Sequence, residues 1–458
     1  MTGYDFSRDA ITVPLVSTAH RSIQTPIPAP GTKVILERLD RIESRSMQGQ
    51  LPLVWDRALD FNVFDAANNK WIDFTSTIFV ANVGHSNPRV TAAIKDALDK
   101  PLYSCYAYGN EIRVRYLEKL VAFAGKPFEK AFLLSAGTEA TDAALKLMRM
   151  HAQKQGKRRR GIICIEGNWH GRTLGAQMLG SNLAQRDWIG YQDKDIYHIP
   201  FPYSWVLKGK SPESFFEESL DKLTSAGIDI AQDIAGFMLE TFQGWGAVFY
   251  PKEYVQAIEA VCRRNDILLA FDEMQSGFGR TGKVFGFQHY EVTPDLICCG
   301  KGMGGGVPLS GVLGRAEVMD LPDVGNMSST HSANPFVCAA GLAVIEELEG
   351  RDLVAESARK GELMFDGLAG LQARFPDRIS GLLGKGMIAA VLFRSPQTGE
   401  PDGLFTSKVA ELCMHKGLLV VHTGRESIKI GPPLTITDAA LLEGVAVLGE
   451  AIAEVASS

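Results

Sequence analysis

The stretch Asp295-Leu-Ile-Cys-Cys-Gly-Lys-Gly-Met-Gly-Gly-Gly-Val-Pro-Leu-Ser310 places a lysine at the end of an apolar run. Leu296 to Cys299 has the composition of a short buried strand, and Lys301 follows it within a cluster of glycines. A primary amine that is desolvated, or set beside other cations, has a lowered pKa and attacks carbonyl groups. A lysine after an apolar run is, on its own, more often a solvated residue at a strand end.

A second apolar run upstream changes this weighting. Ile267-Leu-Leu-Ala-Phe-Asp-Glu273 ends in a carboxylate pair, so two buried strands are expected to deliver Asp272 and Lys301 to their carboxyl ends. This combination suits a pyridoxal 5'-phosphate (PLP) site. The lysine would hold the cofactor aldehyde as a Schiff base, and the aspartate would keep the pyridine nitrogen protonated.

Two longer motifs carry a family resemblance. DEMQSGFGRTG at 272–282 and PDLICCGKGMGGGVPLSGVLG at 294–314 resemble the signature of the class III PLP-dependent aminotransferases, the 4-aminobutyrate and ornithine aminotransferase group. The similarity runs from about Asp65 to about Thr437. It implies PLP fold type I, an α/β fold whose large domain has a mainly parallel, seven-stranded sheet covered by helices. A smaller α+β domain would be built from both termini.

Composition and charge agree with such an enzyme. The chain has 458 residues, of which 45% are hydrophobic and 22% charged, as is typical of a soluble globular protein with more than one domain. Its net charge of −6 gives no strong electrostatic case for binding a nucleic acid or an anionic membrane.

The cysteines and the N-terminus bear on the compartment. Seven cysteines, none in a paired C-x-x-C or Cys/His ligand spacing, predict reduced thiols and no structural metal. MTGYDFSRDAITVPLV lacks the basic and apolar regions of a signal peptide, and no stretch approaches the length of a membrane span. We therefore expect a cytoplasmic protein without a membrane segment.

The chain pattern predicts three parts. Residues 1–75 would form an N-terminal arm and a small-domain segment, with one short helix near 34–42 and an antiparallel sheet. Residues 76–334 would form the large PLP-binding domain, and residues 335–458 would form the C-terminal small domain. The large part alternates helical patterns with apolar strands, expected at 132–134, 161–165, 234–239, 267–271 and 296–299. Functional side chains should lie at the carboxyl ends of these strands.

Two segments after strands are candidates for holding the cofactor. Ser135-Ala-Gly-Thr-Glu-Ala140 leads into a helix whose free N–H groups could bind a phosphate, and the resemblance assigns that part to Gly137 and Thr138. In Gly167-Asn-Trp-His-Gly-Arg-Thr173 the resemblance implies that Trp169 stacks on the pyridine ring. An ordinary turn and a core tryptophan are the plain alternatives, and a structural hydrogen bond explains His170 equally well.

Other cofactor contacts follow from the resemblance. Asp272 would pair with the pyridinium nitrogen, which makes the ring an electron sink. Gln275 matches the family position near the ring hydroxyl, and Glu240 matches an acidic position that orients the same network, although a structural role is as well supported. Thr330 would reach the phosphate bound by the neighbouring chain, which implies a homodimer.

The chain departs from the family pattern at the substrate. Many members carry a glutamate where this chain has Trp245, and an arginine where it has Lys429; there the arginine grips a substrate α-carboxylate and the glutamate masks it. Lysine lacks the bidentate fork, and tryptophan forms no salt bridge. We therefore expect no Glu/Arg switch. Arg425, Lys429 and His422 are candidate anion contacts, with surface solvation as the competing interpretation, and Trp245 suggests a bulky, aromatic or sugar-like donor.

The function implied is amino transfer. A PLP-dependent aminotransferase would move an amino group from an amine or ω-amino acid donor to a 2-oxo acid by a ping-pong mechanism through the Lys301 Schiff base. Proteins with the same family resemblance also include aminomutases, epimerases and a decarboxylase, so these reactions are the alternative. A non-catalytic binding protein is the least favoured hypothesis, because Lys301, Asp272 and Gln275 are all retained.

Overall fold

The computed structural model describes residues 4–47 and 51–457. Residues 1–3 and 48–50, within the expected arm, and residue 458, within the expected C-terminal part, lie outside the described residues. The division at residues 75 and 334 stays a prediction. Among the described residues, no helix combines the length and the apolar character needed to cross a bilayer.

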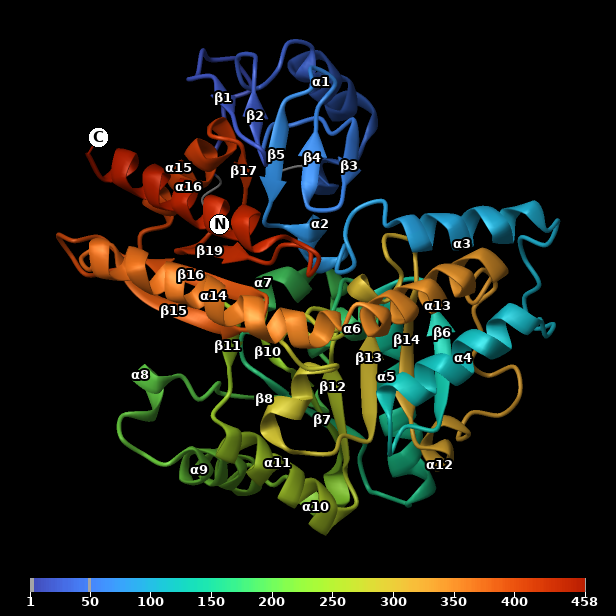
Figure 1. The fold of residues 1–458 in the computed structure, drawn as a ribbon. Coiled ribbons are helices and arrows are strands. Elements are labelled where there is room, and N and C mark those ends of the chain that lie inside the picture. The colour runs from blue at the N-terminus through green and yellow to red at the C-terminus, as the bar shows by residue number, and fades with distance from the viewer. Residues whose placement is uncertain (1–3, 48–50, 458) are drawn as a thin grey trace.

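A seven-stranded sheet forms the centre of the molecule (Figure 1). Only β14 runs antiparallel to its neighbours, so the predicted mainly parallel sheet is confirmed. Its strands, in spatial order, are β6 (Lys130–Leu134), β14 (Ser310–Gly314), β13 (Leu296–Cys299), β12 (Leu268–Asp272), β9 (Ile234–Glu240), β7 (Gly161–Ile165) and β8 (Ile196–Ile199).

The sequence located five of these strands and missed two. β8 is the edge strand Ile-Tyr-His-Ile, only partly buried, and β14 contains two glycines, so neither has the apolar run that marked the others. The five located strands are nearly continuous apolar runs because helices cover both faces of the sheet.

The two faces of the sheet pack against different helices. Leu268, Ala270 and Cys298 pack toward α5 (Gly137–Lys154), whereas Leu269 and Phe271 pack with α9 (Pro212–Ser225) and α11 (Lys252–Asn265). Side chains alternate along a strand, so Asp272 at the end of β12 continues the row that faces α5. This alternation brings the carboxylate next to the start of that helix.

Three further long helices pack on one another beside this sheet. They are α3 (Pro88–Asp99), α4 (Glu111–Ala124) and α13 (Pro335–Gly350), and α13 contacts both of the others. Short elements complete this part of the chain: α2 (Ser76–Phe79), α6 (Leu174–Leu179), α7 (Leu183–Arg186), α8 (Ser204–Leu207), α10 (Ile230–Asp233), α12 (Ala316–Met319), β10 (Phe242–Gln243) and β11 (Val248–Phe249).

Segments from both ends of the chain form the rest of the fold. A four-stranded antiparallel sheet contains β15 (Ile379–Lys385), β16 (Ile388–Phe393), β19 (Ser427–Ile430) and β18 (Val421–His422), with α14 (Leu353–Arg374), α15 (Gly403–His415) and α16 (Asp438–Ser457) packed nearby. A second sheet contains β1 (Val16–Ser17), β2 (Ser22–Ile23), β5 (Lys70–Asp73), β4 (Asn62–Phe64) and β3 (Arg57–Leu59), and α1 (Thr32–Ile42) lies in the same N-terminal segment.

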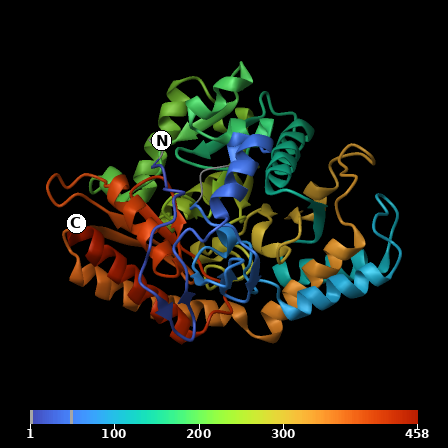
Figure 2. The same ribbon diagram turned by 90° about the horizontal axis from the view of Figure 1, so that it is seen from above.

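One strand joins the two termini. β17 (Leu418–Leu419) pairs in parallel with β5, and the Trp71 indole N–H donates to the carbonyl oxygen of Met414. Figures 1 and 2 accordingly show the blue N-terminal segments beside the red C-terminal ones. The predicted smaller α+β region built from both termini is confirmed.

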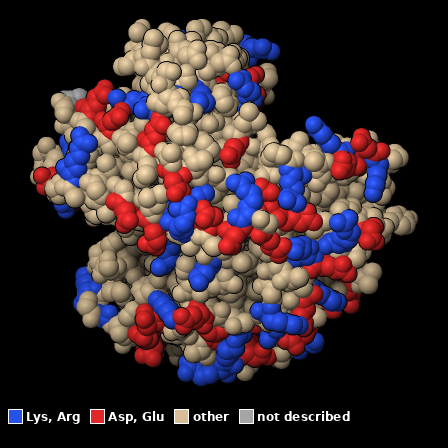
Figure 3. Space-filling view, viewed as in Figure 1, with Lys and Arg blue, Asp and Glu red and all other residues tan. Residues whose placement is uncertain are grey.

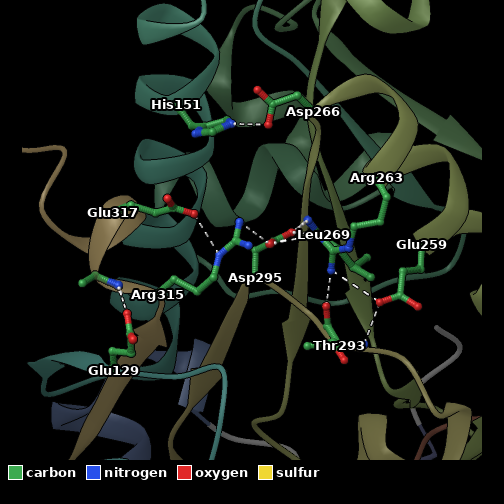
Figure 4. Close-up of polar contacts among 11 residues, drawn as sticks. Glu129, His151, Glu259, Arg263, Asp266, Leu269, Thr293, Asp295, Arg315 and Glu317 are labelled. Atoms are coloured by element: carbon green, nitrogen blue, oxygen red, sulfur yellow. Dashed lines mark hydrogen bonds and ion pairs between the residues drawn. The ribbon is translucent and has the colours of Figure 1, made fainter.

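A buried ion-pair cluster closes the amino end of the central strands (Figure 4). Asp295, just before β13, accepts from Arg263 at 3.0 Å and Arg315 at 2.9 Å, and also from the Leu269 amide. It thereby ties β12 to β13 at the edge opposite the lysine. Elsewhere Figure 3 shows acidic and basic side chains interspersed over the face in view.

Candidate active site

A cavity of about 170 Å³ lies at the carboxyl ends of the central strands. It brings together seven of the eight residues proposed from sequence to hold PLP, from five different segments of the chain. The cavity is lined by Gly137, Thr138, Trp169, His170, Gly171, Glu240, Thr241, Phe242, Asp272, Met274, Gln275, Ser276 and Lys301.

Lys301 supplies an amine without a polar partner. It begins a short 3₁₀ turn after β13 with φ 40°, a left-handed conformation that is uncommon for a residue with a side chain. No hydrogen bond or ion pair reaches its Nζ from the residues that the structure describes. Burial lowers the pKa of the Lys301 amine, and the nearby carboxylates of Asp272 and Glu240 oppose that shift.

Asp272 is held by two contacts. His170 Nδ1 lies 2.9 Å from its Oδ2, and the Met274 amide donates to its Oδ1 at 3.0 Å. His170 is buried, and its second nitrogen, Nε2, has no partner within the described part of the chain. The sequence left a structural hydrogen bond as one interpretation of His170 but did not identify Asp272 as its partner, because the pairing joins segments 102 residues apart.

The start of α5 forms a close backbone approach to the cavity. A Cβ on Gly137 would lie 2.7 Å from the Met274 sulfur, and one on Gly171, whose φ is 140°, would clash with the Thr138 side chain. Thr138 Oγ1 accepts from the amides of Arg172 and Thr173 at 3.1 Å each. Glu139 already accepts from the Ser135 and Ala136 amides, which leaves Gly137 and Thr138 as the helix-start donors beside the cavity.

Trp169 and Met274 contribute apolar walls to the cavity, and the indole of Trp169 is flat. The Trp169 amide donates to Glu240 Oε2 at 3.2 Å, and the Arg172 guanidinium lies 4.4 Å from the centre of the indole ring. Met274 was not singled out from the sequence. The signal available was its place between Asp272 and Gln275, where an alternating chain turns it toward the same cavity.

Glu240 and Gln275 line the cavity, and Lys429 contacts Gln275 from outside the set of lining residues. Burial, together with the Asp272 charge, raises the pKa of Glu240 well above its usual value. Lys429 Nζ donates to Gln275 Oε1 at 2.9 Å and to the Gly244 carbonyl oxygen, and it lies 4.6 Å from the Phe79 ring centre. Burial and the Lys301 charge lower the pKa of Lys429 to about 7, and Glu240 opposes this.

Comparison with known proteins identifies the family. Residues 44–452 match the family model described as aminotransferase class-III. The chain belongs to the class III aminotransferases. Amino-group transfer is therefore its reaction and PLP its cofactor, as the sequence motifs had implied.

Individual relatives are similar over nearly the whole length of the chain. The 4-aminobutyrate aminotransferase of Mycobacterium leprae is 30% identical, covering 95% of this chain and 98% of its own. The leucine/methionine racemase of Thermococcus litoralis is 34% identical over 92% and 95% of the two chains. A solved ornithine aminotransferase from Toxoplasma gondii, which has PLP at partial occupancy in its active site, has a TM-score of 0.80 at 25% identity over 92% and 94%.

The residues of this class III aminotransferase fit the cofactor chemically. A partner-free amine suits an aldehyde, a carboxylate anchored by His170 suits a ring nitrogen, and a helix start with a glycine at close approach suits a phosphate. The indole of Trp169 provides a flat surface for the ring. Each part comes from a different strand end, as expected for an open α/β sheet.

None of the four substrate residues proposed from sequence is among the described residues that line this cavity of the aminotransferase. Trp245 Nε1 donates to Gln243 Oε1 at 2.9 Å, and the Arg425 guanidinium lies 4.0 Å from the indole centre, so these two contact each other instead. His422 lies beside Ser407, 2.9 Å away, and packs edge-on against Phe6. Among the four candidates, Lys429 donates a hydrogen bond to the lining residue Gln275.

Thr330 of the aminotransferase is exposed and lies outside the cavity. Its segment is fixed to the start of α5, because Ser332 Oγ lies 3.1 Å from Ser135 Oγ. A residue at the surface beside the helix start can reach a second chain but does not contact its own site.

Proposed function

We propose that the enzyme transfers an amino group from an amine or ω-amino acid donor to a 2-oxo acid in a ping-pong cycle, with Lys301 as the catalytic amine. The observation that carries the proposal is the partner-free Lys301 amine in the cavity that contains Asp272. An exposed lysine would be solvated and protonated at neutral pH, whereas burial favours the neutral amine.

Each residue has a defined part in this proposal. PLP, when bound, holds the donor nitrogen covalently and accepts the electron pair of the bond that breaks at the donor carbon. Lys301 Nζ would take the proton from the donor carbon and return it to the cofactor carbon on the other side of the donor nitrogen. Asp272 holds the proton on the ring nitrogen, and His170 keeps the carboxylate in position. Gly137 and Thr138 hold the phosphate, Trp169 orients the ring, and Gln275 and Glu240 complete the polar contacts.

A half-reaction screen tests the proposal. Holoenzyme is mixed with one amine at a time, and loss of the cofactor absorbance near the visible edge reports transfer to the protein. Lys301→Ala should lower the turnover by at least about a thousandfold. Lys126→Ala, at a lysine with 85% of its side chain exposed, is the matched control and should not change it. Full transfer activity in Lys301→Ala would refute the catalytic role.

The racemase relative supports a second candidate reaction. The leucine/methionine racemase shares 34% identity, so racemisation of an amino acid on the same scaffold is the alternative. L-Leucine, L-methionine and 4-aminobutyrate therefore belong in the screen. Loss of optical rotation without an added 2-oxo acid would favour racemisation, and transfer that needs the 2-oxo acid would favour the aminotransferase.

We further propose that a Glu/Arg carboxylate switch is absent. Two contacts support this: Lys429 already donates to Gln275 and Gly244, and Trp245 is turned toward Gln243 and Arg425. A donor held without a gripped α-carboxylate would be selected by its size and its flat or apolar surface, such as an aromatic or sugar-like amine. Comparing aromatic amines and amino sugars with 2-amino acids in the screen tests this selection.

A homodimer completes the proposed site. The end of α3 and the segment that connects it to α4 expose several large apolar side chains, namely Leu98, Leu102, Tyr103, Tyr106 and Tyr108. An exposed apolar group of this kind is typical of a protein interface. In the dimer Thr330 would contact the phosphate held by the other chain. Sedimentation of the holoenzyme at the mass of one chain, 49.9 kDa, would contradict the dimer.

The compartment proposed is the cytoplasm. All seven cysteines are free thiols, and six of them are buried. Unpaired thiols in this number suit a reducing compartment.

A further inference from the structure

A second cavity of about 370 Å³ lies outside the proposed active site. We call it the outer cleft. Its walls come from the connection after β8, the β10–β11 hairpin and the four-stranded sheet. The side chains used below are Tyr203, Trp205, Trp245, Arg394, Arg425 and Glu426, and none of them lines the cavity beside Lys301.

One wall of the outer cleft is aromatic. The rings of Tyr203 and Trp205 are stacked, with centres 4.5 Å apart and planes 11° apart. Trp205 is nevertheless 58% exposed, so one face of a large flat ring is left open. Exposed tryptophan of this kind is a favourable surface for another planar ring, because the stacked geometry is already set by Tyr203.

The outer cleft also carries positive charge. Arg394 donates to the Pro376 carbonyl oxygen at 2.9 Å, and within residues 4–47 and 51–457 it has no carboxylate partner. Arg425 pairs with the adjacent Glu426 at 3.3 Å and stacks on Trp245. The cleft thus has two guanidiniums against one carboxylate, and Arg394 is the guanidinium free to accept an anion.

The outer cleft and the active site share a wall. Tyr203 Oη and Trp245 Nε1 both donate to Gln243 Oε1, and Gln243 Nε2 donates to the Glu166 carbonyl oxygen in the segment that leads to Trp169. The carbonyl oxygen of the next residue, Gly244, accepts a hydrogen bond from the Lys429 amine, which also donates to Gln275. A ligand in the cleft therefore lies against the far side of the segment that borders the catalytic cavity.

We propose that the outer cleft binds a planar aromatic ring bearing a carboxylate, with the ring on Trp205 and the carboxylate on Arg394. The open indole face and a guanidinium that has no carboxylate partner among the described residues define this chemistry. The ligand is either the distal end of a donor or acceptor, which depends on the proposed amino transfer, or a separate effector, which does not.

Calorimetric titration of the holoenzyme with 3-phenylpropionate tests the site. The neutral 3-phenylpropanamide and the non-planar 3-cyclohexylpropionate are each expected to bind at least about tenfold more weakly, because one lacks the charge and the other the flat ring. Arg394→Gln and Trp205→Ala should each weaken 3-phenylpropionate by about tenfold as well. Cofactor absorbance and thermal melting confirm that both variants are folded.

Arg57→Gln is the matched control. Arg57 also stacks on an aromatic ring, 4.4 Å from the Phe64 centre, and pairs with the adjacent Asp56, but it lies in β3. It should bind 3-phenylpropionate like the wild type. The proposal is overturned if 3-phenylpropionate gives no binding heat, or if Arg394→Gln binds it as tightly as Arg57→Gln does.

Kinetics then separates the two sources of the ligand. If the cleft holds the distal end of a substrate, 3-phenylpropionate raises KM without changing kcat, and Arg394→Gln abolishes that inhibition. If the cleft holds an effector, 3-phenylpropionate changes kcat at saturating donor. The calorimetry needs no turnover, so failure of the amino-transfer proposal leaves the binding result interpretable.

Discussion

The Lys429 amine donates a hydrogen bond across 2.9 Å to Oε1 of Gln275 and a second one to the Gly244 carbonyl oxygen. Lysine is only a donor, so the Gln275 amide must present its oxygen to Lys429 and its NH2 group elsewhere. The residue that stands at the expected carboxylate-binding position thus fixes the orientation of a glutamine that lines the cavity.

Lys429→Met should therefore reduce activity through Gln275. Loss of a buried hydrogen bond from a charged donor is worth about 1.5–3 kcal/mol, which predicts a fall in kcat/KM of about 10- to 150-fold. The measurement is steady-state kinetics on Lys429→Met, Gln275→Ala and the double variant. If Lys429 acts by orienting Gln275, the double variant is little worse than Gln275→Ala alone. Fully additive losses would contradict this relationship.

Lys429 also predicts a pH dependence of stability. Burial lowers its pKa from 10.5 to about 7. Between these values the unfolded chain retains a proton that the folded enzyme has released, so the free energy of unfolding attributable to Lys429 increases with pH across this window. The penalty of the buried ammonium is complete below pH 7. Urea unfolding should show the wild type gaining stability relative to Lys429→Met from about pH 7 to about pH 9.5. Lys126→Met should show no such gain.

His170 should act through Asp272. Removing a hydrogen bond to the carboxylate, as in His170→Phe, is expected to lower kcat by about 10- to 100-fold. His170→Asn, whose amide occupies the place of Nδ1, should restore most of the rate. The contact between Asp272 and the cofactor ring nitrogen is measured independently, by the wavelength of the cofactor absorbance band. Equal kcat values for the Phe and Asn variants would indicate that the histidine only fills space.

Thr330 tests the shared site directly. Lys301→Ala and Thr330→Glu chains, co-expressed with different tags, should each be inactive alone. In a hybrid dimer one site combines Lys301 of one chain with Thr330 of the other, so a random mixture should recover about a quarter of wild-type activity. If Thr330 acts within its own chain, or does not act at all on the phosphate, this recovery is not obtained.

Asp295 should matter for stability and not for turnover. Asp295→Ala removes a buried carboxylate that holds two partly exposed arginines and the Leu269 amide, at the strand ends opposite Lys301. We expect a loss of about 2–4 kcal/mol in the free energy of unfolding, with kcat of the folded enzyme unchanged. Glu218→Ala, which breaks the Lys210 ion pair of an exposed carboxylate within α9, is the control and should cost less than about 1 kcal/mol.

Much of the site followed from the sequence because it lies in short runs. Gly137 and Thr138, Trp169, Glu240, Asp272 and Lys301 each follow an apolar strand, and parallel strands end at one edge. The apolar runs predicted that these residues lie at strand ends, and the resemblance to the class III aminotransferases implied the parts of Gly137, Thr138, Trp169 and Glu240. The strands of the central sheet could also be located from the sequence, except for β8 and β14. The sequence of β8 is partly exposed and that of β14 contains glycines, so both lack the apolar run.

What the sequence did not predict depends on side-chain direction across long separations. The pairing of His170 with Asp272, the placement of His422 beside Ser407, and the turn of Trp245 away from Lys429 are all set by tertiary packing. The stacked Tyr203 and Trp205 of the outer cleft lie at the start of α8, a four-residue helix that is too short to carry a periodic signal.

The pairing of β17 with β5 means that the fold of this enzyme is completed only late in translation. Residues 70–73 are translated early, but their partner strand at 418–419 follows almost 350 residues later. At about 5–20 residues per second, the exposed edge of β5 waits for about 20 to 70 s before it is covered. Lys429 is made later still, so the polar network behind the cofactor is among the last parts to assemble. A nascent chain stalled before residue 418 should remain a client of chaperones and should not retain PLP.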